Sequence, residues 1–149
     1  EDMEEKFQRG FEDAEENGFY RAAVDYLLYT VRCYFLMYVE DPSDKGYIVR
    51  MEDHLQITEE WLEKHSFLDD QYRADYWYFY CLLLQLKGED TENALKKASY
   101  FSGRVNETSK YKKLKALLRN LEKIGASGSK IGNLDLEIGN FYNMIVSFC

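Results

Sequence analysis

The chain has 149 residues, with 27 Asp and Glu against 19 Lys and Arg, a net charge of −8, two His, one Pro and three Cys. With 46% apolar and 31% charged residues, the composition excludes a disordered tail and a membrane bundle. The length indicates one domain, residues 1–149, and the few His and Cys leave few candidate nucleophiles, bases or metal ligands.

The first predicted helix covers residues 2–17. Its apolar residues recur every three or four positions, which places them on one helix face, while acidic residues occupy the other faces. The stripe consists of Met3, Phe7, Phe11 and Ala14. Asn17-Gly18 is typical of a helix stop, so we expect the first helix to end there.

The second predicted helix covers residues 19–39 and is apolar nearly all round. Its 21 residues are enough to cross a bilayer. However, it carries Arg21, Asp25 and Arg32, and charges inside a spanning helix are costly. We therefore interpret it as a central helix surrounded by protein, and we expect no membrane partner.

The rest of the chain continues the helical pattern, with turn signals between the segments. Further helices are predicted at residues 47–65, 71–86, 91–104, 107–125 and 134–148. Residues 125–133 resemble a linker before the last helix. No run alternates with a period of two, so the predicted fold is all-α, with six or seven antiparallel helices. Either an irregular helical bundle or an array of helical hairpins fits this pattern.

One motif favours the hairpin array. Gly18-Phe19-Tyr20-Arg21-Ala22-Ala23 has the G-x-Y-x-x-A order that opens the second helix of a tetratricopeptide repeat, and Leu27 follows where that repeat has a large apolar residue. We expect Gly18 to allow two helices to approach each other. The chain thus resembles a degenerate tetratricopeptide-like array over at most 85 residues, although Thr30 and Phe35 depart from the motif. The resemblance implies a scaffold that binds other proteins and no catalysis.

The chemistry-bearing residues do not form a catalytic or metal-binding pattern. His54 and His65 lack the spacings of helical metal sites, and no two cysteines have zinc-ligand spacing. Cys33, Cys81 and Cys149 are odd in number and widely spaced, which predicts reduced thiols and a cytoplasmic, reducing location. The N-terminal segment lacks the pattern of a signal peptide. We therefore expect no enzyme activity, no metal and no cofactor.

Charge is distributed unevenly along the chain. Residues 1–75 carry 20 acidic and 8 basic residues, whereas residues 76–149 carry 7 acidic and 11 basic ones. The sixth predicted helix is basic and amphipathic, and Lys112, Lys113 and Arg119 are its candidate partner-binding residues. Three alternatives remain open for it: an ordinary solvated face, a face that binds an acidic partner, and pairing with the acidic first helix. That last pairing would occur within one molecule or, as self-association, between molecules. Because the chain is acidic overall, we do not expect nucleic-acid binding.

The 13 tyrosines are the second feature that points to a function. They are concentrated in the second and fourth predicted helices, and one helix cannot direct all of its rings inward. There are two alternatives, and the sequence leaves them open. Either some of these tyrosines line a groove, or both helices are buried on every side. We take Tyr29, Tyr38, Tyr76 and Tyr80 as candidate contact residues.

These observations predict a non-catalytic module for protein–protein interaction or assembly. It would bind another protein or peptide through an aromatic-rich helical groove, with the basic helix as a separate face. The alternative is a helical small-molecule binder or enzyme subunit, with an aromatic pocket between the same helices.

Overall fold

The computed structural model describes residues 2–127 and residue 148, and within them the protein is all-α, as the sequence predicts. The described part contains six helices and no strand. Their bounds are α1 (Asp2–Glu16), α2 (Tyr20–Glu40), α3 (Gly46–Lys64), α4 (Asp70–Leu86), α5 (Glu92–Arg104) and α6 (Thr108–Ser127). Each predicted boundary among these six helices lies within two residues of the observed one.

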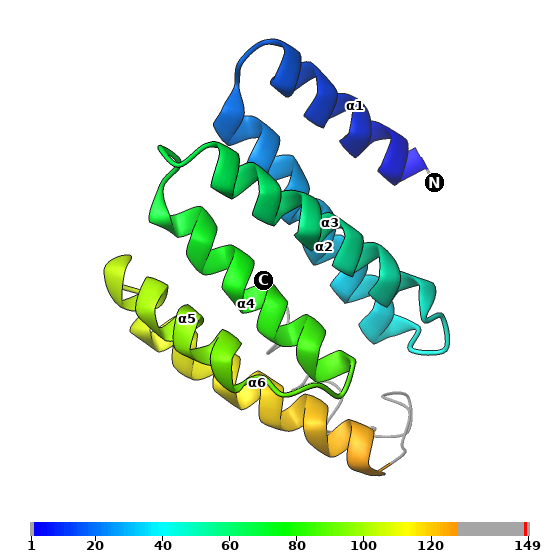
Figure 1. The fold of residues 1–149 in the computed structure, drawn as a ribbon. Helices are drawn as coiled ribbons and strands as arrows, with labels where there is room; N and C mark the ends of the chain where they lie inside the picture. Colours follow the sequence, from blue (N-terminus) through cyan, green and yellow to red (C-terminus); the bar gives the residue numbers. More distant parts are fainter. Residues whose placement is uncertain (1, 128–147, 149) are drawn as a thin grey trace.

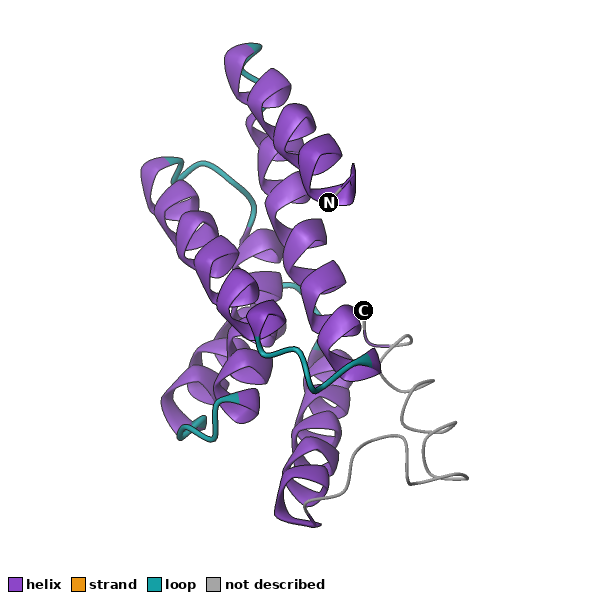
Figure 2. Ribbon diagram, turned by 90° about the vertical axis from the view of Figure 1, so that its right-hand side faces the viewer, coloured by secondary structure: helices purple, strands orange, loops and turns teal. Residues whose placement is uncertain are grey.

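The helices are stacked in chain order (Figure 1). Each helix packs against the next one in the chain, and α4 also packs against α2 and α6. In the view of Figure 1, α3 lies in front of α2 and α5 lies in front of α6, with α4 between these two pairs. In the turned view of Figure 2, α1, which carries the N-terminus, lies at the top of the stack and α6 lies at its lower end. Short turns force this arrangement, because consecutive helices must lie side by side.

The core is built mainly from α2 and α4. Both helices have apolar residues on more than one face, and both are packed between neighbours. Phe35 on α2 is fully buried, and Tyr78 on α4 is 1% exposed. By contrast, α1 and α6 each pack one apolar stripe and expose a charged face, which suits helices at the ends of a stack. The stripe of α6 is buried, whereas in α1 only Ala14 is buried and the rest of the stripe is half-buried.

Two glycines end helices in a conformation that other residues rarely adopt. Gly18 follows α1 with φ +73°, and Gly88 follows α4 with φ +72°. The backbone N–H of Phe19 donates to the carbonyl of Ala14 at 2.8 Å, which closes the last turn of α1. A Cβ on either glycine would meet nothing within 4 Å. The interpretation that Gly18 lets two helices approach is therefore wrong; its positive φ is the reason for a glycine there.

The predicted linker at residues 125–133 begins too early, because α6 continues to Ser127. Ala126 is a strong helix former, and Gly125 alone does not end the helix. Residues 128–133 and the predicted last helix, apart from Phe148, lie outside the described residues. Among the helices of residues 2–127, none combines the length and the hydropathy needed to cross a membrane.

Candidate functional site

Three aromatic residues on α4 contact one another. The rings of Tyr76 and Tyr80, one helical turn apart, are parallel within 11° with centroids 5.8 Å apart. The ring of Trp77 stands edge-on to both, at 5.1 Å from Tyr76 and 5.5 Å from Tyr80. Perpendicular contacts of this kind are favourable because the edge of one ring carries positive charge and the face of another carries negative charge. The cluster therefore holds its rings in a defined arrangement.

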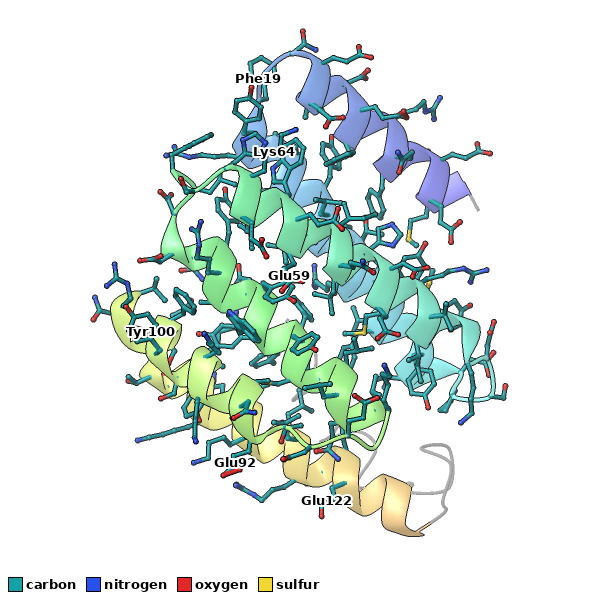
Figure 3. All side chains as sticks on the ribbon, viewed as in Figure 1. Phe19, Glu59, Lys64, Glu92, Tyr100 and Glu122 are labelled. Carbon is teal, nitrogen blue, oxygen red and sulfur yellow. The ribbon has the colours of Figure 1, made fainter. Side chains whose placement is uncertain are left out.

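These rings line a hollow between α3 and α4, with a volume of 220 Å³, which we call the α3–α4 hollow. Its apolar wall includes the buried side chains of Leu55 and Leu83. Its polar residues all come from α3, and they are Glu52, Gln56 and Glu59. Figure 3 shows Glu59 between α3 and α4, on the face turned toward the viewer. The hollow thus combines aromatic rings from one helix with carboxylates from the other.

Carboxylates lie near Tyr76, which is the most buried of the three rings. The pKa of Tyr76 is raised, first by burial and then by the nearby carboxylates of Glu59 and Glu63, with Tyr80 adding to the rise. At the other end, Nζ of Lys87 lies 2.7 Å from Oε2 of Glu52. The chain also places a cation on Trp77, since Nζ of Lys97 lies 5.9 Å from the ring centroid. Two lysines of the chain therefore lie beside the carboxylates and rings of this hollow.

The structure brings together two of the four candidate tyrosines. Tyr76 and Tyr80 line the α3–α4 hollow, where Tyr76 is only 5% exposed and forms a wall, while Tyr80 is half-buried. Tyr29 is 47% exposed on α2 and lines a different hollow beside α1. Tyr38 is half-buried near the end of α2, and it lines neither of these two hollows. The four tyrosines therefore do not share one groove.

The candidate basic residues Lys112, Lys113 and Arg119 are all exposed on α6. The opposite side of α6 is buried, and the buried residues are Leu114, Leu117, Leu118 and Leu121. Since α1 and α6 lie at opposite ends of the stack in both views, the interpretation that they pair within one molecule is wrong (Figures 1 and 2). Packing in chain order separates the first and last helices by the width of the stack.

Reasoning from the sequence did not select Trp77, Glu52 or Glu59 as site residues. One signal was available: Glu52 and Glu59 are seven residues apart, which places them two turns apart on the same helix face. Nothing in the sequence alone identified α4 as the helix that this face meets.

Both histidines pack against neighbouring residues, and burial raises the pKa of the Cys33 and Cys81 thiols. Nδ1 of His54 lies 2.9 Å from the carbonyl oxygen of Arg50. His65 stacks on Tyr20, and its Nε2 is buried without a hydrogen-bond partner among the described residues. Burial raises the pKa of the Cys81 thiol to about 12, so it is not ionised at neutral pH. Within the part of the chain that the structure describes, no cluster of three or more His, Cys, Asp or Glu could hold a metal ion.

Comparison with known proteins adds no identification. No protein-family model, no curated protein and no solved structure matches this chain.

Proposed function

We propose that the protein is a non-catalytic interaction module that binds another protein or a peptide. The observation that carries this proposal is the α3–α4 hollow, in which Trp77 and Tyr80 are partly exposed beside a buried apolar wall. Tyr and Trp are enriched among the residues that dominate binding energy at protein interfaces, because they combine a large apolar ring with a polar group.

The size of the hollow favours a protein partner over a small molecule. Its 220 Å³ lies below the range of roughly 300–1,000 Å³ that is usual for small-molecule sites. A hollow of this size has room for one side chain that projects from a partner. The resemblance to tetratricopeptide-like arrays agrees with this proposal, because it implies a scaffold that binds other proteins. The free thiols Cys33 and Cys81 fit a reducing, cytoplasmic setting for this activity.

Affinity capture with matched variants tests the proposal. Tyr80→Ala and Trp77→Ala each remove one partly exposed ring from the hollow, while Tyr100→Ala removes an equally large ring that is 59% exposed on α5. We expect the same partner to be captured by the wild type and by Tyr100→Ala, and to be lost with the two hollow variants. Tyr76 is left in place because it is buried. Equal capture by all four proteins, each checked for helix content, would contradict the proposal.

The alternative function as a small-molecule binder has its best location elsewhere. A hollow of 500 Å³ lies between α1, α2 and α3, which is within the usual range for ligands. Two of its polar groups already satisfy each other, because Tyr34 donates a hydrogen bond to Glu4. Native mass spectrometry of the purified protein tests this alternative, since a bound metabolite adds its mass to the protein. A ligand that is lost on substitution of Tyr34→Phe would favour it.

A further inference from the structure

We propose that the α3–α4 hollow receives the side chain of an arginine from a basic segment of the partner. This inference rests on the proposed function and adds the chemistry of what is bound. It follows from three features that meet at one place: aromatic ring faces, unbalanced carboxylates and a volume suited to a single side chain.

The rings provide faces for a cation. Trp77 and Tyr80 are both partly exposed and stand at 89° to each other, so a group that enters the hollow can lie on the face of one ring and against the edge of the other. The ring face carries negative charge and attracts cations, most strongly in tryptophan. The chain itself uses this property, because Lys97 places its ammonium 5.9 Å from the Trp77 centroid.

The charges on α3 select a cation over a neutral group. Glu52, Glu59 and Glu63 lie two turns or one turn apart along the helix, and the last two are close enough to raise the pKa of Tyr76. Lys87 offsets part of this charge, but it is shared between Glu52, at 2.7 Å, and Glu89, at 3.3 Å. Lys97 adds a second positive charge at Trp77, but among the described residues neither Glu59 nor Glu63 forms an ion pair, so the α3 side of the hollow keeps an excess of negative charge. An anionic or acidic segment would be repelled.

Arginine satisfies both features at once. Its guanidinium is planar, stacks on aromatic faces and donates several hydrogen bonds from one edge to a carboxylate. A guanidinium that lies on Trp77 or Tyr80 would direct its N–H groups toward α3, which contributes Glu59 and Glu52 to the lining. Lysine has the charge but lacks the planar fork, so we expect it to bind more weakly.

The two tryptophans allow a direct test by nuclear magnetic resonance, because each indole N–H gives its own signal. Trp77 lines the hollow, whereas Trp61 lies outside it against Phe11 and His65 and serves as an internal reference. The probes are acetyl-Gly-Arg-Gly-amide and the same peptide with citrulline, which has nearly the same shape and no charge. We expect the arginine peptide, at millimolar concentration, to shift the Trp77 signal in a saturable way and to leave Trp61 unchanged. The citrulline peptide should shift neither signal.

A matched pair of variants tests the role of the carboxylates. Glu59→Gln removes one charge from the lining of the hollow and keeps nearly the same side-chain shape, and we expect it to weaken binding of the arginine peptide about tenfold. Glu60→Gln removes the same charge from the next residue of α3, which does not line the hollow, and should leave binding nearly unchanged. Equal effects of the two variants would show that only the overall charge matters, and would overturn the inference.

The outcomes separate this inference from the proposed function. If arginine and citrulline peptides shift Trp77 equally, or if neither shifts it, the inference is wrong, whatever the capture experiment shows. If the arginine peptide binds as expected but Tyr80→Ala still captures the partner, the cation site stands and the proposed function fails. A lysine peptide that binds more tightly than the arginine peptide would contradict the choice of arginine.

Discussion

The hydroxyl of Tyr78 donates a hydrogen bond to Oε1 of Glu107 at 2.9 Å, and this contact joins the buried middle of α4 to the residue that precedes α6. The same carboxylate oxygen accepts a second hydrogen bond from Nε2 of Gln71 at 3.1 Å. One acidic side chain thus satisfies two donors on α4 and sets where α6 begins relative to the core. Polar groups removed from water require such partners.

Glu107→Ala should therefore destabilise the protein by about 2 kcal/mol, because the Tyr78 hydroxyl is left in the core without its acceptor. Glu107→Gln keeps a carbonyl acceptor and should cost less. Tyr78→Phe removes the hydroxyl that donates this hydrogen bond and should cost about 1 kcal/mol of stability. Urea denaturation followed by circular dichroism measures all three. An alanine variant as stable as the wild type would show that this contact does not contribute.

Asp75 should make stability depend on pH. Its pKa is raised from 3.8 to about 6, chiefly by burial, with Glu107 and Asp25 adding to the rise while Lys110 and Gln71 oppose it. Between about pH 4 and pH 6 the folded protein therefore binds a proton that the unfolded chain has lost. The free energy of unfolding contributed by this group falls as pH rises through that window, by about 2 to 3 kcal/mol.

Asp75→Asn removes this titration and serves as the comparison. At pH 7 we expect the asparagine variant to be more stable than the wild type, and near pH 4 the difference should vanish. Denaturation midpoints at several pH values measure it. A difference that stays constant between pH 4 and pH 7 would show that Asp75 titrates at its ordinary value.

Substitution by alanine should lower stability at the glycines that end helices and raise it at a glycine inside a helix. Gly18→Ala and Gly88→Ala each force a Cβ into the left-handed region, and we expect each to cost about 1 kcal/mol. Gly103 lies within α5, where a Cβ would meet nothing within 4 Å, so Gly103→Ala should stabilise by about 0.5 to 1 kcal/mol. Thermal unfolding of the three variants checks the signs, and the same sign at all three positions would contradict the explanation.

The two tyrosines of the α3–α4 hollow should differ in their effect on stability. Tyr76→Ala removes a ring that is 5% exposed and leaves a cavity, for which we expect a loss of about 3 kcal/mol. Tyr80→Ala removes a half-buried ring and should cost clearly less. Urea denaturation compares them, and equal losses would show that Tyr80 belongs to the core, so that it could not be used to test binding.

The basic face of α6 makes a separate prediction. Lys112→Glu combined with Lys113→Glu changes two exposed residues and should alter the free energy of unfolding by less than about 0.5 kcal/mol per site. If this face binds an acidic partner, the double variant should lose affinity for poly-L-glutamate, and the wild-type affinity should fall as salt rises. Unchanged affinity would remove this face from the proposed binding surface.

Only part of the candidate site could be predicted from the sequence. Tyr76 and Tyr80 were selected from their aromatic segment, and the structure places them together in one hollow. Tyr29 was selected on the same grounds but belongs to another surface. The acidic residues of the hollow were missed because they come from α3, and the sequence of neither helix shows which faces of α3 and α4 meet.

Within residues 2–127, the sequence by itself determined which segments are helical and where they end, because apolar spacing, glycines and turn residues act over a few positions. Gly18 and Gly88 end their helices through their own backbone conformation, without help from distant residues. Whether an aromatic ring is core or surface was decided only by the tertiary structure: Tyr78 is 1% exposed while Trp77, the residue before it, is half-buried beside the hollow. On a helix that is apolar nearly all round, no periodicity marks an outer face, so the neighbours packed against it decide which rings remain available for binding.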